Sequence, residues 1–158
     1  QVFLAYEFIS GDDPDTEDDE MFDILWGRWS RWSEIYGRAS AYNPETRTGQ
    51  MANYHRFGPG WGASPTKKMD VSVSYNLMYA AQDTPTRASV PNVFGSNPSN
   101  GFSSDGTFRG HYLQAILKYK FSQHVSGHLW SEFVFPGHFY ADSTATMTFL
   151  RAELMFTF

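Results

Sequence analysis

Residues 145–158 read Ala-Thr-Met-Thr-Phe-Leu-Arg-Ala-Glu-Leu-Met-Phe-Thr-Phe, and their alternation decides the fold class. Every second residue counted back from Phe158 is apolar as far as Leu150, whereas the intervening set carries Arg151 and Glu153. Side chains of a β-strand alternate between two faces, so this strand has one apolar and one polar face. A soluble sandwich buries such an apolar face, and an outer-membrane barrel turns it to lipid. The terminal aromatic residue favours the barrel, because the machinery that assembles such barrels recognises one there.

Five further segments show the same period of two, and turn residues separate them. In the last of them Leu129 and Phe133 fall on one face, whereas His128 and Glu132 fall on the other. The second is the weakest, because glycine and proline dilute its alternation. The segments are 2–10, 51–62, 67–80, 109–121 and 124–135.

The predicted connections alternate in length. Loops 11–50 and 81–108 are long, turns 63–66 and 122–123 are short, and loop 136–144 is intermediate. Outer-membrane barrels have short periplasmic turns and longer extracellular loops, so this alternation predicts an all-β, transmembrane antiparallel β-barrel. Part of the first long loop, Glu34–Tyr42, is expected to be an extracellular excursion of the sheet and not another crossing.

Composition agrees with a membrane barrel and bounds its size. Of the 158 residues 18% are aromatic and only 18% are charged. No run of 18 apolar residues is present, so no transmembrane helix is expected, and the absence of cysteine excludes disulfides. Six strands are too few to close a bacterial barrel, whose smallest members have about 8. We therefore expect residues 1–158 to be the C-terminal part of one larger barrel domain, unless other chains complete the wall.

The acidic residues are concentrated in one segment. Residues 12–23 hold eight of the 17 Asp and Glu, so the remainder of the chain is mildly basic. Asp12, Asp13 and Asp15 are a weak calcium candidate, because they lack the EF-hand spacing, and a solvated loop is the alternative. No catalytic motif, metal-ligand spacing or basic stripe is present, so no enzyme, cofactor or nucleic-acid partner is expected.

Charged residues on the polar faces are candidates for the lining of a pore. One interpretation is a selectivity lining for anions, in which cations attract the solute and acids balance them. The other is an ordinary polar lumen with ion pairs between neighbouring strands, such as Glu132 with Arg151. The candidate lining residues are Arg56, Lys68, Lys118, Lys120, Arg151, Glu132 and Glu153.

A tryptophan-rich stretch lies inside the first long loop, at 26–38. Tryptophan faces stack on sugar rings and arginine forks onto carboxylates, so this stretch is a candidate contact for an acidic polysaccharide. Alternatively the loop folds inward and packs its own aromatic side chains, or the tryptophans lie at the lipid headgroups. The candidates are Trp26, Trp29, Trp32, Arg28 and Arg31.

With these strands placed, several stretches resemble the alginate export family of outer-membrane proteins. They include YEFISGDDPDT at 6–16, FDILWGRWSRWSEIY at 22–36, SPTKKMDVSVSYNLMYAA at 64–81, FRGHYLQAILKYKFSQHVSGHLWSEFVFPGHFY at 108–140 and FLRAELMFTF at 149–158. The resemblance implies a large monomeric barrel, with about 18 strands in the best-known type. It also implies passive export of an anionic uronate polysaccharide through a lumen lined with Arg and Lys.

The predicted function is therefore an outer-membrane channel of a Gram-negative bacterium for an anionic, alginate-like polysaccharide or for small anions. The expected partners are the lipid and lipopolysaccharide of the outer membrane, and the barrel-assembly machinery acting through Phe158. The alternative is a structural wall or sleeve that houses or anchors a partner, such as a cytochrome or a surface assembly, without transport.

Overall fold

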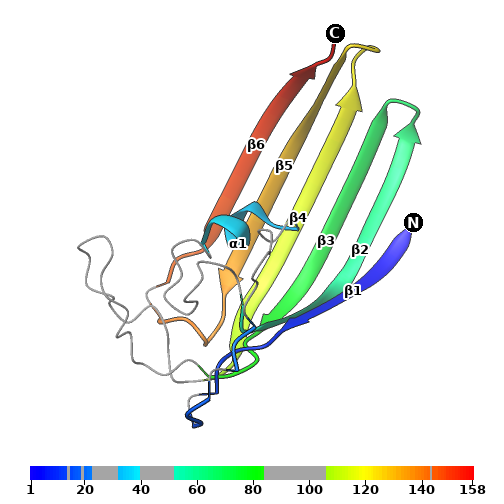
Figure 1. The fold of residues 1–158 in the computed structure, drawn as a ribbon. Coiled ribbons are helices and arrows are strands. Elements are labelled where there is room, and N and C mark those ends of the chain that lie inside the picture. Colours follow the sequence, from blue (N-terminus) through cyan, green and yellow to red (C-terminus); the bar gives the residue numbers. More distant parts are fainter. Residues whose placement is uncertain (14, 19, 23–31, 40–51, 84–105, 143) are drawn as a thin grey trace, which may run out of the picture.

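The computed structural model describes residues 1–13, 15–18, 20–22, 32–39, 52–83, 106–142 and 144–158. These residues form six β-strands and one short helix (Figure 1). The elements in chain order are β1 (Val2–Ile9), α1 (Glu34–Ala39), β2 (Tyr54–Thr66), β3 (Met69–Tyr79), β4 (Phe108–Lys120), β5 (Val125–Pro136) and β6 (Met147–Phe156).

All six strands lie in a single antiparallel sheet in the order β1-β2-β3-β4-β5-β6, so each strand pairs with its neighbours along the chain. Both short turns and the C-terminus lie at one end of the sheet, which we call the short-turn end (Figure 1). The longer connections leave from the opposite end, which we call the loop end. Within the described residues, β1 and β6 each have a strand partner on one side only. The all-β, antiparallel part of the prediction is confirmed.

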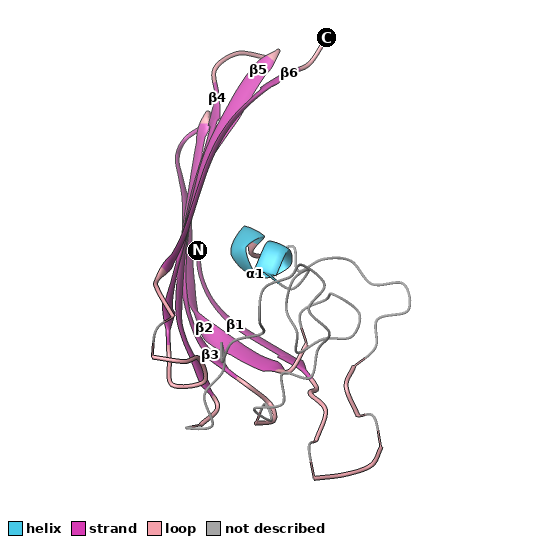
Figure 2. Cartoon of the chain, turned by 90° about the vertical axis from the view of Figure 1, so that its left-hand side faces the viewer, coloured by secondary structure: helices cyan, strands magenta, loops and turns pink. Residues whose placement is uncertain are grey.

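The sheet bends along its strands, so that it has a concave and a convex face (Figure 2). The strand register places the more apolar of the two alternating sets of each strand on the convex face, opposite α1. Large apolar side chains remain exposed there because nothing in the described chain covers them. They include Val2, Leu4, Tyr6, Phe8, Phe57, Trp61, Val73, Tyr75, Leu117, Tyr119, Leu129, Phe135, Leu150, Leu154 and Phe156.

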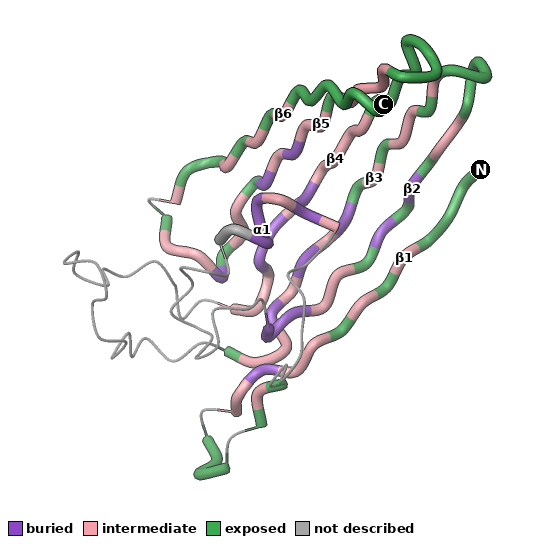
Figure 3. The backbone as a smooth tube through the Cα atoms, turned by 45° about the horizontal axis from the view of Figure 1, so that its top comes forward, coloured by how far each residue is buried: buried purple, intermediate pink, exposed green. Residues whose placement is uncertain are grey.

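The buried side chains of the strands lie on the concave face, and further buried residues lie in the connections at the loop end (Figure 3). Tyr54, Met78, Tyr112 and Val134 of the sheet pack there against Ile35 and other residues of α1. The exposed apolar set thus lies on one side of the sheet and the small core on the other, which reverses the arrangement of a soluble sheet with a buried apolar face.

The structure corrects the predicted boundary between the second and third strands. Residues 63–66, expected to be a turn, belong to β2, and the turn is formed by Lys67 and Lys68. Between β2 and β3 the paired residues keep one register from His55 to Ala63, with a gap in the pairs at Gly58 and Pro59, and the register shifts between Ala63 and Thr66. Proline has no N–H to give to the ladder, which accounts for the gap at Pro59.

The structure also corrects the expectation for residues 34–42. Glu34–Ala39 form helix α1 on the concave face, not an excursion of the sheet (Figures 1 and 2). A helix of six residues is far too short to be stable in isolation. Its stability must come from the side chains of the sheet beneath it.

Candidate functional site

A buried carboxylate of β5 holds the first turn of α1. Glu132 is fully buried, and its two carboxylate oxygens accept the backbone N–H groups of Glu34 at 2.9 Å and Ile35 at 3.0 Å. The Ser33 hydroxyl donates to the same carboxylate at 2.8 Å and accepts the N–H of Tyr36 at 3.1 Å, so Ser33 is the N-cap. Negative charge is favoured at a helix N-terminus, where N–H groups lack partners.

This arrangement corrects the expected role of Glu132. The carboxylate does not line an open lumen, because α1 covers it. The side chain also does not pair with Arg151, since Glu132 lies opposite Phe149 in the ladder and Arg151 lies opposite Trp130. Besides α1, the carboxylate accepts the Gln114 amide N–H at 3.3 Å. Glu132 is therefore the anchor of α1.

Aromatic side chains fill the space between α1 and the sheet. The Trp32 ring lies edge-on to Tyr112, with ring centroids 5.1 Å apart, and tilted against Tyr36 at 5.4 Å. The Tyr112 hydroxyl and the Gln114 amide both donate to the Trp32 carbonyl oxygen. Burial, followed by the neighbouring Tyr140, raises the pKa of Tyr36 well above its usual value, so Tyr36 stays neutral.

Arg151 on β6 holds α1 from a second side. Its guanidinium lies 2.7 Å from the Glu34 carboxylate and donates through Nε to Nε2 of His128 at 3.1 Å. It also stacks over the Trp130 ring, 4.9 Å from the centroid. Glu153 is less constrained, with its side chain 42% exposed and 3.9 Å from Arg151. Arg151 therefore faces the concave side as predicted. Its guanidinium binds Glu34 of α1, however, and does not form part of an open lining.

The guanidinium of Arg56 on β2 also has its partners within the protein. Its guanidinium donates to Glu7 at 3.2 Å and to the Asn76 side-chain oxygen at 3.2 Å, and it stacks over the Trp32 ring at 4.4 Å. The side chain is only 15% exposed. Arg56 thus braces β1 and β3 beneath Trp32, and its charge is largely satisfied within the protein.

At the loop end a buried arginine forms hydrogen bonds to two connections, the one before β2 and the one after β5. Arg109 donates through Nε and Nη2 to the carbonyl oxygen of Asn53 at 3.2 and 2.9 Å, and through Nη1 to the Tyr140 hydroxyl at 3.1 Å. Its guanidinium also stacks on Phe139, 4.2 Å from the ring centroid. Asn53 has φ 59°, a region that Asn tolerates, and it exchanges two hydrogen bonds with Gln82.

Arg109 reaches the concave face because β4 contains a bulge. Phe108 pairs with Tyr79 and Gly110 pairs with Met78, so Arg109 is an extra residue between them. Gly110 has φ 129°, which favours glycine, and a Cβ there would lie 2.1 Å from the Phe135 carbonyl oxygen. The bulge therefore turns Arg109 away from the convex face, to which simple alternation assigns it.

Replacing Arg109 by leucine should destabilise the loop end strongly. The change leaves the Asn53 carbonyl and the Tyr140 hydroxyl without this donor, at an expected cost of about 2–4 kcal/mol. The urea midpoint of unfolding measures this loss. Arg109→Lys retains the charge but cannot fork onto both oxygens, so it should lose roughly half as much. If the free energy of unfolding of the leucine variant is within about 0.5 kcal/mol of the parent value, the hydrogen bonds of Arg109 do not stabilise the loop end.

Three lysines differ from the arginines: Lys118 and Lys120 take the concave face by the register of β4, and Lys68 lies in the adjoining turn. Lys68, Lys118 and Lys120, which we call the lysine triplet, lie close together at the short-turn end, where the Lys120 N–H donates to the Lys68 carbonyl at 2.8 Å. All three side chains are exposed, and their ammonium groups form no ion pair with any described residue. Asp70 lies opposite Lys118 in the ladder, but its carboxylate accepts the Ser64 hydroxyl. The triplet is therefore a free cationic patch.

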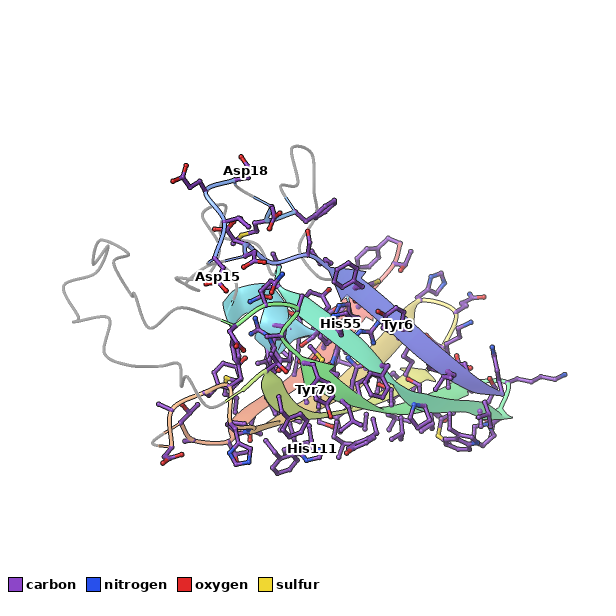
Figure 4. All side chains as sticks on the ribbon, turned by 90° about the horizontal axis from the view of Figure 1, so that it is seen from below. Tyr6, Asp15, Asp18, His55, Tyr79 and His111 are labelled. Atoms are coloured by element: carbon purple, nitrogen blue, oxygen red, sulfur yellow. The ribbon has the colours of Figure 1, made fainter. Side chains whose placement is uncertain are left out.

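The acidic loop does not form a metal centre within the described residues, where no group of three or more His, Cys, Asp or Glu is placed to hold an ion. Asp12 accepts the Glu20 N–H at 3.2 Å, and Asp13 accepts the Asp15 N–H at 3.0 Å. Asp18 lies at the far end of the loop, away from the sheet, in Figure 4. Two of the three candidate carboxylates thus stabilise turns of their own loop.

Among the tryptophan-loop candidates, only Trp32 belongs to the described part of the chain. Trp26, Trp29, Arg28 and Arg31 lie outside the described residues. Trp32 packs against α1 and the sheet, which is the arrangement of a loop that folds inward.

Two histidines lie on the convex face near the loop end, each beside a tyrosine. Nδ1 of His55 is 2.9 Å from the Tyr6 hydroxyl, and the two side chains lie side by side in Figure 4. The Phe8 ring stacks on His55, with centroids 4.6 Å apart. The Tyr75 hydroxyl likewise approaches His111 across β3 and β4. Such pairs present polar groups at one edge of an otherwise apolar face.

Sequence reasoning missed three residues that build this site. Ser33 followed by Glu34 is an N-cap signal with an acidic first turn, and it was available in the sequence. Gly110 within an alternating segment is a known indicator of a bulge, and it would have suggested the inward turn of Arg109. No local signal predicts the contact between Ser33 and Glu132, because 99 residues separate them.

Within the ranges that the structure describes, no helix has the length and apolarity needed to cross a membrane. Comparison with known proteins finds no family model, no curated protein and no solved structure that matches this chain. The functional assignment therefore rests on the two faces of the sheet, the anchored helix and the free lysine triplet.

Proposed function

We propose that this chain is part of the wall of an outer-membrane β-barrel channel of a Gram-negative bacterium, through which anions pass passively. One observation carries the proposal: most of the exposed large apolar side chains of the strands lie on the convex face, while the Asp, Glu, Lys and Arg side chains of the strands and α1 lie on the concave face. An apolar outer band with a polar interior is the arrangement that a barrel needs in lipid.

The free edges of β1 and β6 support a larger barrel. An open sheet edge in hydrocarbon leaves N–H and C=O groups without partners, at a cost of several kcal/mol for each group. Further strands must therefore close the sheet in a membrane. The resemblance to the alginate export family suggests about 18 strands, supplied by one longer chain.

The concave face suggests how such a channel would select its solute. Helix α1 narrows the lumen from the loop end, and the lysine triplet presents three unpaired positive charges at the short-turn end. Cations along a lumen wall lower the barrier for an anion without binding it so tightly that it cannot leave. We therefore propose an anionic polysaccharide, alginate-like in charge, or small anions as the solute.

The alternative is a structural sleeve that houses or anchors a partner and does not transport. The position of α1 favours this alternative, because an anchored helix occupies the lumen side of the wall. A sleeve filled in this way would not conduct ions.

Planar-bilayer recording of the assembled full-length protein distinguishes the two. A channel gives discrete conductance steps and, in a salt gradient, a reversal potential biased toward anions. Protein that inserts into the bilayer but stays electrically silent would favour the sleeve. Protein that does not insert at all would contradict the membrane assignment itself.

A further inference from the structure

A histidine on β5 connects the anchored helix to the exposed part of the concave face. His128 lies between Lys118 of β4 and Glu153 of β6 in the ladder. The His128 side chain is 18% exposed, so water reaches the ring. Imidazole is the side chain that changes its charge between about pH 5 and 8. The contacts of this ring therefore decide whether the concave face responds to pH.

The hydrogen bond from Arg151 fixes the protonation state of the ring. Nε of Arg151 lies 3.1 Å from Nε2 of His128. A guanidinium group only donates hydrogen bonds and keeps its proton in proteins, so Nε2 is the acceptor. The proton of the ring is then on Nδ1, which lies 4.0 Å from the Glu153 carboxylate. The observed contacts are those of a neutral imidazole.

The same hydrogen bond sets the direction of the Arg151 guanidinium. This group is planar and rigid, so fixing Nε orients its two terminal nitrogens. One of them, Nη1, lies 2.7 Å from the carboxylate of Glu34 in the first turn of α1. The Trp130 ring supports the guanidinium plane, with its centroid 4.9 Å away. His128 thus positions the arginine that binds the helix.

Charged groups face His128 from both neighbouring strands. From β6, Arg151 approaches Nε2 and Glu153 approaches Nδ1. From β4, Lys118 lies opposite His128, and Asp70 lies one strand further, opposite Lys118. Helix α1 contributes the carboxylate that Arg151 binds, and β5 itself contributes the carboxylate that anchors α1. Two cations therefore flank the ring directly, against one carboxylate.

A second proton on the ring opposes the observed geometry. It would occupy Nε2, so two N–H groups would face each other across 3.1 Å and a cation would lie between Lys118 and Arg151. Glu153 compensates little, because its side chain is 42% exposed and it faces Nδ1, which carries a proton in both states. The protonated ring and the guanidinium must therefore move apart.

We propose that His128 is a proton-dependent positioning residue for α1. The neutral ring holds Arg151 against Glu34, and the protonated ring releases it and loosens the helix. The anchored arrangement excludes a proton from Nε2, so lowering the pH favours the loosened one. This inference goes beyond the proposed transport function, because it depends on the contacts of α1 and not on conduction.

Hydrogen exchange at the Gly37 N–H, which bonds to the Ser33 carbonyl inside α1, tests the switch in the full-length protein in detergent. After correction for the intrinsic effect of pH on exchange, protection should fall roughly fivefold between about pH 8 and pH 5, as for the loss of one hydrogen bond. His128→Gln retains an acceptor for Arg151 but does not titrate, so its protection should stay high at both pH values. His128→Phe retains a ring without an acceptor, so its protection should stay low at both.

The glutamine variant separates His128 from every other titrating group, because it retains the remaining histidines and all carboxylates. A fall in protection in His128→Gln equal to that of the parent would assign the pH response to another group and overturn the switch. Constant protection in the parent protein would overturn it as well. Bilayer conductance tests the proposed channel separately: it should rise with acid in the parent and stay constant in His128→Gln. A protein that inserts but is electrically silent at both pH values would contradict the channel, while the exchange data would still decide the switch.

Discussion

Glu132→Ala should release α1 from the sheet and raise the conductance of the proposed channel. The carboxylate accepts two backbone N–H groups of the first helical turn and the Ser33 hydroxyl, all at 3.0 Å or less. Hydrogen bonds to a charged group contribute about 1.5–3 kcal/mol each and do not add fully, so we expect a loss of about 3 kcal/mol in docking. A six-residue helix cannot persist without that anchor.

Hydrogen exchange measures the release independently of transport. The Gly37 N–H donates to the Ser33 carbonyl inside α1, and its exchange should accelerate roughly 100-fold if about 3 kcal/mol is lost. Glu153→Gln is the control, because Glu153 lies on the same face of the neighbouring strand and its carboxylate approaches two residues of the sheet, His128 at 4.0 Å and Arg151 at 3.9 Å. Unchanged exchange at Gly37 in Glu132→Ala would mean that aromatic packing alone holds the helix.

Reversing the charge of the lysine triplet should invert the ion selectivity of the proposed channel. In the variant Lys68→Glu, Lys118→Glu, Lys120→Glu, three exposed cations without ion-pair partners among the described residues become three anions at the short-turn end. The reversal potential in a salt gradient should change from anion-biased to cation-biased. The effect should shrink in about 1 M salt, where charges are screened beyond about 3 Å.

A charge-conserving variant controls for side-chain shape. Arginine at the same three positions retains the positive charge and should leave the sign of the reversal potential unchanged. An anion bias that survives the glutamate variant would move the selectivity to other parts of the barrel. Arg56 and Arg151 are poor candidates for that role, because ion pairs within the protein occupy both.

The all-β, antiparallel architecture and the two faces of each strand follow from alternation alone. Residues 145–158 show why, since an apolar period of two from Leu150 to Phe158 is compatible with only one orientation of the strand. The number of strands and their approximate positions were predicted in the same way. The turn at Lys67 and Lys68 was misplaced, because Pro65 and its neighbours resemble a turn locally although they continue β2.

Only the tertiary structure determined which charged side chains of the concave face have partners within the protein. Glu132, Arg151 and Arg56 share a face with the lysine triplet, and alternation cannot distinguish them. Their difference arises because α1 folds onto the sheet and encloses Glu132, while it leaves the short-turn end uncovered. The sequence by itself determined which face most strand residues take, since that depends on alternation along the strand; Arg109, at the bulge of β4, is the exception. Hydrogen bonds between segments about a hundred residues apart determine which of these charged side chains are bound to α1. Only the folded chain brings those segments together.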